Sequence, residues 1–396
     1  MSYVTLGEVT HVVSKGTTPS SVGLSFSTTG VPFLKGEDVL GRQINFSVAN
    51  TFISEASHQV LNRSALEYGD VLITIAGTIG RTGFIAEKGS VANCNQAVAF
   101  ARPELEKVDP EWLCYLLQSP GFQSKFAEFV AGGAIPNVNL QQIRSLEIPC
   151  IGVDQQRQIA ARLKAQLAEV ETARQAVQVQ LRDAAFLRQR LLRQTFDALA
   201  DGPHKVLGEW ATITSGVTPA RDRSDYWQPA EVPWVKTGEI DFAPITSVQE
   251  SISKKALAEC SLSLLPPKTV LVAITGEGKT RGRSAVLEVA ATTNQHSVSI
   301  LPNDTWDAYF LQLWMQSSYH DLRELSEGRG GSRSALSGGQ IKALEIPAPD
   351  IDDQRCIVSR VKQQLVEADA LRTSLEQQLR DLDALPQRIL AKAFEN

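Results

Sequence analysis

The amino-acid sequence predicts an α+β protein made of two similar halves, each a globular domain of short strands and helices followed by one long helix. Three observations support this. Residues 154–196 and 352–394 match without a gap at a constant offset of 198 residues. The stretch before each match mixes short β-like runs with glycine, proline and serine. Residues 153–200 contain no glycine or proline, which favours a single long helix.

Within the first globule, apolar β-like runs are followed by two segments with helical periodicity, and the same pattern recurs over residues 207–340. The expected strands are 70–76, 83–86 and 96–101, and the expected helices are 109–118 and 122–130. The expected boundaries are 1–150 for the first globule, 151–200 for the central helix, 201–348 for the second globule and 349–396 for the distal helix.

Each long helix carries an apolar residue every seven positions, with a companion stripe four residues on. Two helices with the same seam, related by a pseudo-two-fold axis, are expected to pack as an antiparallel coiled coil. An alternative, in which each helix packs only on its own globule, is less favoured because a globule cannot bury a stripe roughly 70 Å long. The predicted seam is Leu163, Leu167, Val170, Val177, Leu181, Leu191, Val361, Leu365, Ala368, Leu375, Leu379, Leu382 and Ile389.

Arginine interrupts the companion stripe of both helices, at Arg174 and Arg372. Pro386 occurs only in the second copy, where the first has Arg188. Because proline lacks a backbone N–H and clashes with the preceding turn, Pro386 is expected to kink or end the second helix.

Composition limits the location of the protein. The 396 residues include 43% hydrophobic residues, as in ordinary folded domains, and no apolar run is long enough to span a bilayer. The first residues lack the basic and apolar regions of a signal peptide. Five scattered cysteines favour reduced thiols over a disulfide framework. These features predict a cytoplasmic protein that does not contact a membrane.

The net charge of −5 does not favour general attraction to nucleic acid, and no segment forms a basic tail. Any DNA contact must therefore come from local basic clusters on an acidic body. Binding by this chain alone is expected to be weak, with a partner supplying part of the phosphate contact.

Several short motifs occur once in each half at corresponding positions. These are G-[TV]-T-P at 16–19 and 216–219, V-P-[FW]-[LV]-K at 31–35 and 232–236, V-L-[IV]-x-I-x-G at 71–77 and 270–276, Asn-Gln at 95–96 and 294–295, and LEIP followed by D-[QD]-Q-R at 146–157 and 344–355. Together with the long helices, they resemble the DNA-specificity subunit of type I restriction–modification enzymes. The resemblance covers the whole chain.

This resemblance implies a non-catalytic subunit. Each globule would be a target-recognition domain that reads one half of a bipartite site in double-stranded DNA. The helices would act as a spacer and as a docking surface for two modification (methyltransferase) subunits, which would hold the S-adenosylmethionine. A restriction subunit, an ATP-dependent translocase and nuclease, would join through the complex. This chain itself would need no cofactor or metal.

The physical interpretation is compatible with that division. Two similar globules separated by a stiff helical spacer could contact two DNA segments one or two helical turns apart, each turn about 34 Å. The DNA between the two segments would then be sequence-independent.

Candidate DNA contacts lie on loops that correspond between the halves, where hydroxyl, amide and basic side chains can meet phosphates or base edges. The alternatives are ordinary turns for the G-[TV]-T-P loops, solvent-facing hairpin charges for the loops after the long strands, connectors for the glycine-rich loops, and locally satisfied amides for the Asn-Gln pairs. The candidates are Lys15, Thr17, Thr18, Lys35, Thr78, Arg81, Asn95, Gln96, Asn137, Asn139, Thr218, Arg221, Arg223, Lys236, Lys279, Arg281, Arg283, Asn294, Gln295, Arg329 and Arg333.

Two other functions compete with this interpretation. The first is a P-loop NTPase, because residues 273–280 nearly fit the phosphate-binding pattern G-x-x-x-x-G-K-[ST], with alanine in place of the first glycine and Gly278, Lys279 and Thr280 at its end. A turn and a strand are expected after this loop, whereas a nucleotide site needs the start of a helix. The second alternative is a structural coiled-coil adaptor without a DNA role, which would suit the acidic globules.

Overall fold

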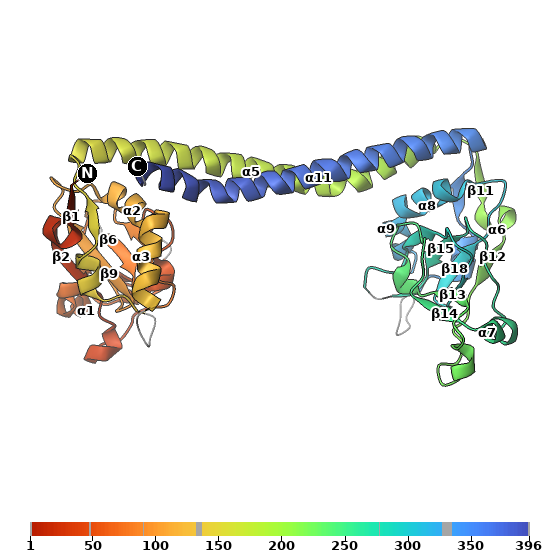
Figure 1. The fold of residues 1–396 in the computed structure, drawn as a ribbon, viewed down its shortest axis with the longest axis horizontal. Helices are drawn as coiled ribbons and strands as arrows, with labels where there is room; N and C mark the ends of the chain where they lie inside the picture. The colour runs from red at the N-terminus through yellow and green to blue at the C-terminus, as the bar shows by residue number, and fades with distance from the viewer. Residues whose placement is uncertain are drawn as a thin grey trace. The chain divides into compact units, whose positions relative to one another are not determined.

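A computed structural model describes residues 2–46, 49–89, 91–131, 137–276, 278–326 and 335–394. The chain divides into two compact units, one formed by Met1–Gln178 with Gln377–Asn396 and the other by Val179–Glu376. Each unit therefore contains one globule and a part of both long helices (Figure 1). Within the described ranges, no helix is both long and apolar enough to cross a lipid bilayer.

The first globule is built on two four-stranded sheets. The first is antiparallel and has the order β2 (Thr10–Lys15), β9 (Val98–Pro103), β6 (Val71–Thr74) and β7 (Thr82–Phe84). The second has the order β4 (Phe52–Ile53), β3 (Val31–Leu34), β8 (Ala92–Cys94) and β5 (Ala65–Leu66), with β3 and β8 parallel. A separate pair joins β1 (Tyr3–Thr5) to β10 (Glu147–Pro149).

Helices complete this globule. Asp109 caps helix α2 (Pro110–Gln118) by accepting a hydrogen bond from the Trp112 backbone N–H at 2.9 Å, and Pro110 occupies the first helical position. This helix packs against β6 and β7 and buries Trp112 and Tyr115. The helices are α1 (Glu55–Val60), α2 (Pro110–Gln118), α3 (Pro120–Ala131) and α4 (Leu140–Arg144). The three strands and two helices expected here are thus present, with small shifts at their ends.

The second globule repeats this arrangement. Its main sheet has the order β12 (Ile213–Ser215), β18 (Ser297–Ile300), β15 (Val270–Ala273) and β16 (Ser284–Val286). Its other sheets are β14 (Glu250–Ile252), β13 (Val232–Val235) and β17 (Thr292–Thr293), and the pair β11 (His204–Val206) and β19 (Glu345–Pro347). Its helices are α6 (Leu207–Trp210), α7 (Lys254–Glu259), α8 (Ala308–Ser317), α9 (Tyr319–Glu324) and α10 (Gly338–Lys342). The duplication in sequence is therefore also a duplication of fold.

The two long helices, α5 (Val153–Asp197) and α11 (Ile351–Phe394), pack antiparallel within each unit. In the first unit, Arg174 Nε lies 2.7 Å from Asp383 Oδ1, and in the second, Arg188 Nη1 lies 3.1 Å from Asp369 Oδ2. Most of the predicted seam is at most 9% exposed: Leu163, Leu167, Val170, Val177, Val361, Leu365, Ala368 and Leu375. Leu181, Leu379 and Leu382 are half-buried. The predicted antiparallel coiled coil is confirmed.

The seam changes where each helix ends. Leu192 and Leu390 are buried, whereas the predicted residues Leu191 and Ile389 are only half-buried. A straight helix drifts by roughly 20° per heptad, so four heptads move the buried stripe by almost one residue. The buried residue near each helix end thus lies one position later than the predicted Leu191 and Ile389, and it packs in a globular core.

Both helix ends pack on a globular core. In the first unit, the α11 residue Phe394 meets Trp112 edge-to-face, with ring centroids 6.3 Å apart. In the second unit, the α5 residue Phe196 meets Phe310 in the same manner at 5.4 Å. Each globule is thus held by the start of the helix that follows it and by the end of the other helix. Seam packing and globule packing coexist, which neither of the two predicted arrangements included.

Helix α11 continues through Pro386 as far as Phe394, so the prediction that Pro386 could end this helix is wrong. Proline removes one hydrogen bond, to the carbonyl four residues earlier. Burial of Leu390 and the ring contact of Phe394 offset this loss, because they anchor the turns beyond Pro386 to the first globule.

A buried glutamine explains the D-[QD]-Q-R motif at the start of each long helix. Gln156 Nε2 donates to the carbonyls of Lys107 (2.9 Å) and Ile151 (2.8 Å), and its Oε1 accepts from the Asp109 N–H at 2.8 Å. Gln354 makes the same three contacts in the second unit, with the carbonyls of Thr305 and Pro349 and the N–H of Asp307. The glutamine therefore fastens the helix start to the globule through backbone atoms alone.

Candidate nucleic-acid interface

In each globule, two of the predicted loops lie together. The Thr18 hydroxyl donates to Gln96 Oε1, and the Thr218 hydroxyl donates to Gln295 Oε1. Gln96 and Gln295 are exposed. Because the threonine occupies the oxygen of the glutamine, the amide N–H₂ remains as a donor on the surface. This pairing spans 78 residues in the first globule and 77 in the second.

The conformation of these loops requires glycine. A Cβ added to Gly16 would overlap the carbonyl oxygens of Cys94 and Asn95, and one added to Gly216 would overlap that of Thr293. The next residue of each loop, at position 17 or 217, donates its backbone N–H to the same neighbouring strand at 3.0 Å. The first glycine of the G-[TV]-T-P motif thus allows the close approach that brings the threonine to the glutamine.

Four predicted residues of the first globule line one concavity of about 470 Å³. They are Lys35, Thr78, Arg81 and Asn95. Lys35 forms a loose ion pair with Glu37 at 3.7 Å, and Asn95 Oδ1 accepts from the Ala97 N–H at 3.1 Å. Lys15 is the last residue of β2, and Thr17 follows it after Gly16. The structure thus groups basic and amide side chains that the sequence distributes over 60 residues.

Several of the predicted basic residues of the second globule differ, because acidic residues pair with them. Arg221 and Lys236 both contact Glu250, each at 3.0 Å. The hydrogen bond from Lys236, followed by that from Arg221, holds the pKa of Glu250 below its usual value. Arg223 pairs with Asp225 at 2.6 Å, and this contact lowers the pKa of Asp225. All five side chains remain at least partly exposed.

Arg221 also packs on aromatic rings. Its guanidinium carbon lies 3.8 Å from the ring centroid of Trp227 and 5.1 Å from that of Trp234. Trp234 is buried and Trp227 is half-buried, so the tryptophans act mainly as packing residues.

Two candidates are interior in this structure. Arg281 is 3% exposed and Asn294 is 7% exposed. Asn294 Oδ1 accepts from the Thr237 hydroxyl at 2.8 Å and from the His296 N–H at 3.1 Å. The asparagine of each Asn-Gln pair therefore accepts a hydrogen bond from the backbone two residues on, and the glutamine is the exposed member of each pair.

The loop before each junction is only partly described. Asn137 is exposed and forms an isolated bridge with Ala76. Asn139 caps α4, accepting from the Gln142 N–H at 2.9 Å. Arg329 and Arg333 lie outside the described residues.

The loop that resembles a nucleotide-binding motif lies between two strands. Lys279 is in a turn after β15, and β16 follows at Ser284. The Tyr319 hydroxyl donates to the Lys279 carbonyl at 2.7 Å. The expected turn and strand are thus present after residues 273–280, where a phosphate-binding loop would need the N-terminus of a helix.

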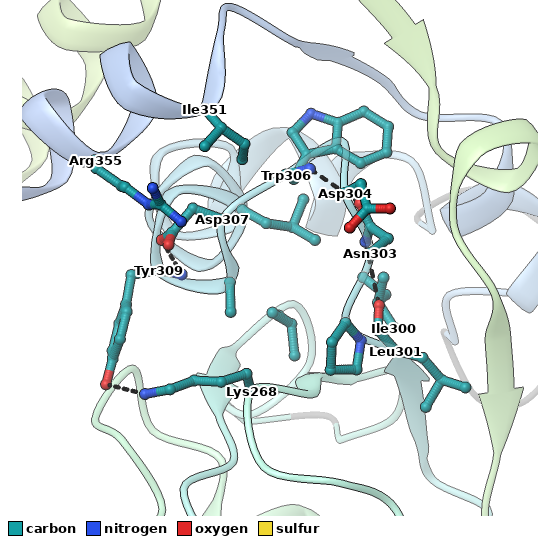
Figure 2. A pocket seen from close by; sticks show the side chains of 14 residues that line it. Lys268, Ile300, Leu301, Asn303, Asp304, Trp306, Asp307, Tyr309, Ile351 and Arg355 are labelled. Carbon is teal, nitrogen blue, oxygen red and sulfur yellow. Dashed lines mark hydrogen bonds between the residues drawn. The ribbon is translucent and has the colours of Figure 1, made fainter.

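The second globule also has a pocket of about 420 Å³ at its junction with α11 (Figure 2). Figure 2 shows Lys268 meeting the hydroxyl of Tyr309 on one side, and Arg355 and Ile351 approaching from α11. The residue of the first globule that corresponds to Lys268 is Gly69, and Leu105 packs near it. The two junctions therefore share their glutamine but differ in the surrounding surface.

A family model described as the type I restriction modification DNA specificity domain matches residues 1–179 and again residues 204–380. Each match covers one globule and part of the helix that follows it. The chain belongs to this family.

Curated proteins similar to this member of the DNA specificity family include two specificity subunits. That of the type I restriction enzyme EcoR124I/EcoR124II from Escherichia coli is 23% identical over 155 residues, which is 39% of this chain and 38% of that protein. That of MjaIX from Methanocaldococcus jannaschii is 29% identical over 163 residues, which is 39% of this chain and 35% of that protein. These matches span less than half the length of the curated relatives.

Two solved structures share the fold over nearly the whole chain. The HsdS subunit from Thermoanaerobacter tengcongensis matches with a TM-score of 0.70 and 20% identity, covering 99% of this chain and 96% of that one. A chain from a structure on the assembly and conformational transition of the type I restriction–modification system matches with a TM-score of 0.65 and 20% identity, covering 99% and 97%. The predicted family and fold class are thus confirmed.

Arg42 was not among the candidates taken from the sequence. It lines a second concavity of the first globule together with Arg81. Its only signal in the sequence is the Gly41-Arg42 pair after the V-P-F-L-K motif, where the second globule has no basic residue.

Proposed function

We propose that this chain is the DNA-specificity subunit of a type I restriction–modification complex, in which residues 1–150 and 201–348 each recognise one half of a bipartite site in double-stranded DNA. The carrying observation is that one specificity-family model matches both halves, each with its own globule whose main sheet has the same strand order. The differences between the halves lie in loops, as expected if each globule binds a different sequence.

The reading surface in this proposal contains the Thr18–Gln96 and Thr218–Gln295 pairs. Their amide donors can meet acceptors on base edges or phosphates. In the first globule the concavity with Lys35 and Arg81 adds positive charge beside this pair. The chain itself takes no catalytic part, and methyl transfer would take place in partner subunits that bind S-adenosylmethionine.

The long helices are proposed to dock the modification subunits, one for each half, and through them a restriction subunit. Four large apolar side chains on the helices support this: Val179, Phe186, Val366 and Leu371 are 53%, 67%, 68% and 48% exposed. These side chains are candidates for the surface that a partner subunit would cover.

The test is footprinting of the complex assembled from this chain and its modification subunits, at low and at physiological salt. We expect two protected segments separated by a gap of fixed length. Modification subunits without this chain should protect no bipartite sequence. If the assembled complex protects none either, the chain is a structural adaptor and the proposal fails.

A further inference from the structure

We propose that the first globule binds one phosphate of the DNA backbone between Arg42 and Arg81, at a site that the second globule has neutralised. The inference rests on the proposed function, because it assigns a DNA contact to a defined pair of side chains.

Backbone pairing places the two arginines together. The Arg42 carbonyl accepts from the Phe84 N–H at 2.7 Å, and the Ile44 N–H donates to the Phe84 carbonyl at 3.0 Å. This aligns the Arg42 loop with β7, and Arg81 directly precedes β7. Both arginines line a concavity of about 440 Å³, whose other lining residues include Gly41, Gly80 and Gln118.

The charge of this concavity is uncompensated. None of its lining residues is acidic, although the chain carries a net charge of −5. Neither guanidinium has an ion pair with another residue of the described ranges. Arg42 is held from one side, because its guanidinium carbon lies 5.1 Å from the ring centroid of Tyr115. Two arginines that face a concavity without a carboxylate match the geometry and charge of a phosphate group.

The second globule provides an internal comparison. Its residue Arg283 corresponds to Arg81, since each directly precedes the equivalent strand and follows a glycine with a φ of +87°. Leu40 of the first globule corresponds to Asp241 of the second. Asp241 Oδ1 lies 2.6 Å from Arg283 Nη1, so the second arginine is already paired.

The position of Arg42 also differs, because the second globule has Ala243 there. Two substitutions, Leu40 to aspartate and Arg42 to alanine, thus separate the two arginines of the first globule from the single, paired arginine of the second. Both affect charge and leave the strand order unchanged.

Position favours DNA as the source of the phosphate. Arg81 also lines the concavity that contains Lys35, Thr78 and Asn95. A backbone phosphate bound by Arg42 and Arg81 would therefore lie beside the proposed reading surface. Phosphate contacts fix register and add affinity without selecting bases. The first half of the site would accordingly contribute more sequence-independent affinity than the second.

The experiment exchanges the charge pattern between the globules. Leu40→Asp and Arg42→Ala should weaken binding, and Asp241→Leu should strengthen it by releasing Arg283. Leu40 is 61% exposed and the Asp241 side chain is 63% exposed, so these exchanges should not disturb folding. The probe is a fluorescein-labelled duplex carrying the site found by methylation mapping, titrated with the complex of the full chain and its modification subunits.

We expect Leu40→Asp and Arg42→Ala each to lower affinity roughly tenfold and to reduce the slope of log affinity against log salt by about 1. The preferred bipartite sequence should not change. Asp241→Leu should raise affinity severalfold with a steeper slope.

Unchanged affinity and slope in Leu40→Asp and Arg42→Ala would overturn the inference, as would a changed sequence preference, which would mean that the arginines contact bases. Inorganic phosphate is titrated separately. Binding of free phosphate that needs Arg42, without any loss of DNA affinity in Leu40→Asp, would assign the site to a free anion and also overturn it. Absence of site-preferring binding by the wild-type complex would instead refute the proposed function.

Discussion

At the scale of single residues, Gln156 and Gln354 couple the long helices to the globules. Each side chain satisfies one backbone N–H and two carbonyls in a buried place. A buried polar group left without its partner costs free energy, so removal of the glutamine should destabilise the packing of the long helix on its globule.

We predict that Gln156→Ala lowers the free energy of unfolding by about 2–4 kcal/mol, because three buried backbone groups lose their partner. The matched control is Gln155→Ala, whose side chain is exposed and which should change stability by less than about 0.5 kcal/mol. Urea denaturation followed by circular dichroism measures both. Equal effects of the two variants would contradict the assigned role of Gln156.

Residue types were easier to predict than their partners. The sequence marks G-[TV]-T-P and Asn-Gln as repeated motifs, but the Thr18–Gln96 bond joins residues 78 apart and depends on the fold. Similarly, Asp241 from a loop and Glu250 from β14 neutralise predicted DNA contacts of the second globule. A pattern of basic residues in one sequence does not show which of them form ion pairs with acidic residues.

At the scale of elements, the heptad pattern predicted the helices and most of the seam, because a repeat of 3.5 residues fixes which face is buried. It failed at Leu191 and Ile389, where the helices leave the seam and pack on globular cores. The strands β3, β4, β5 and β8 were not among those expected, since strands of two to four residues carry little periodicity.

We predict that Val170→Asp destabilises the coiled coil by about 3 kcal/mol or more, because it places a carboxylate in a buried seam. Val170 is 8% exposed. Val179→Asp is the matched control on the same helix, since Val179 is 53% exposed. Thermal unfolding of the full chain compares them, and a seam function for Val170 would be refuted if both variants melted alike.

At the scale of the whole molecule, the duplication joins a repeated framework to differing surfaces. The order of the main-sheet strands and the junction glutamine recur in both halves, whereas the charge near the candidate DNA-binding loops does not. Under the proposed function, this combination would allow the sequence bound by one globule to change while the junction and helix contacts are kept.

If the helices set the distance between the two DNA segments, a longer pair of helices should recognise a longer gap. We predict that insertion of one heptad into both helices, after Gln178 and after Glu376, adds about 10 Å and lengthens the gap by about three base pairs. Methylation mapping measures the gap. An unchanged gap in a folded, active variant would show that the helices do not set it.

The most direct test of the central claim is replacement of residues 1–150 by the corresponding globule of another family member, followed by genome-wide mapping of methylated sites. The account predicts that one half of the bipartite site changes, while the other half keeps its sequence. A site that changed in both halves, or in neither, would contradict the assignment of one half-site to each globule.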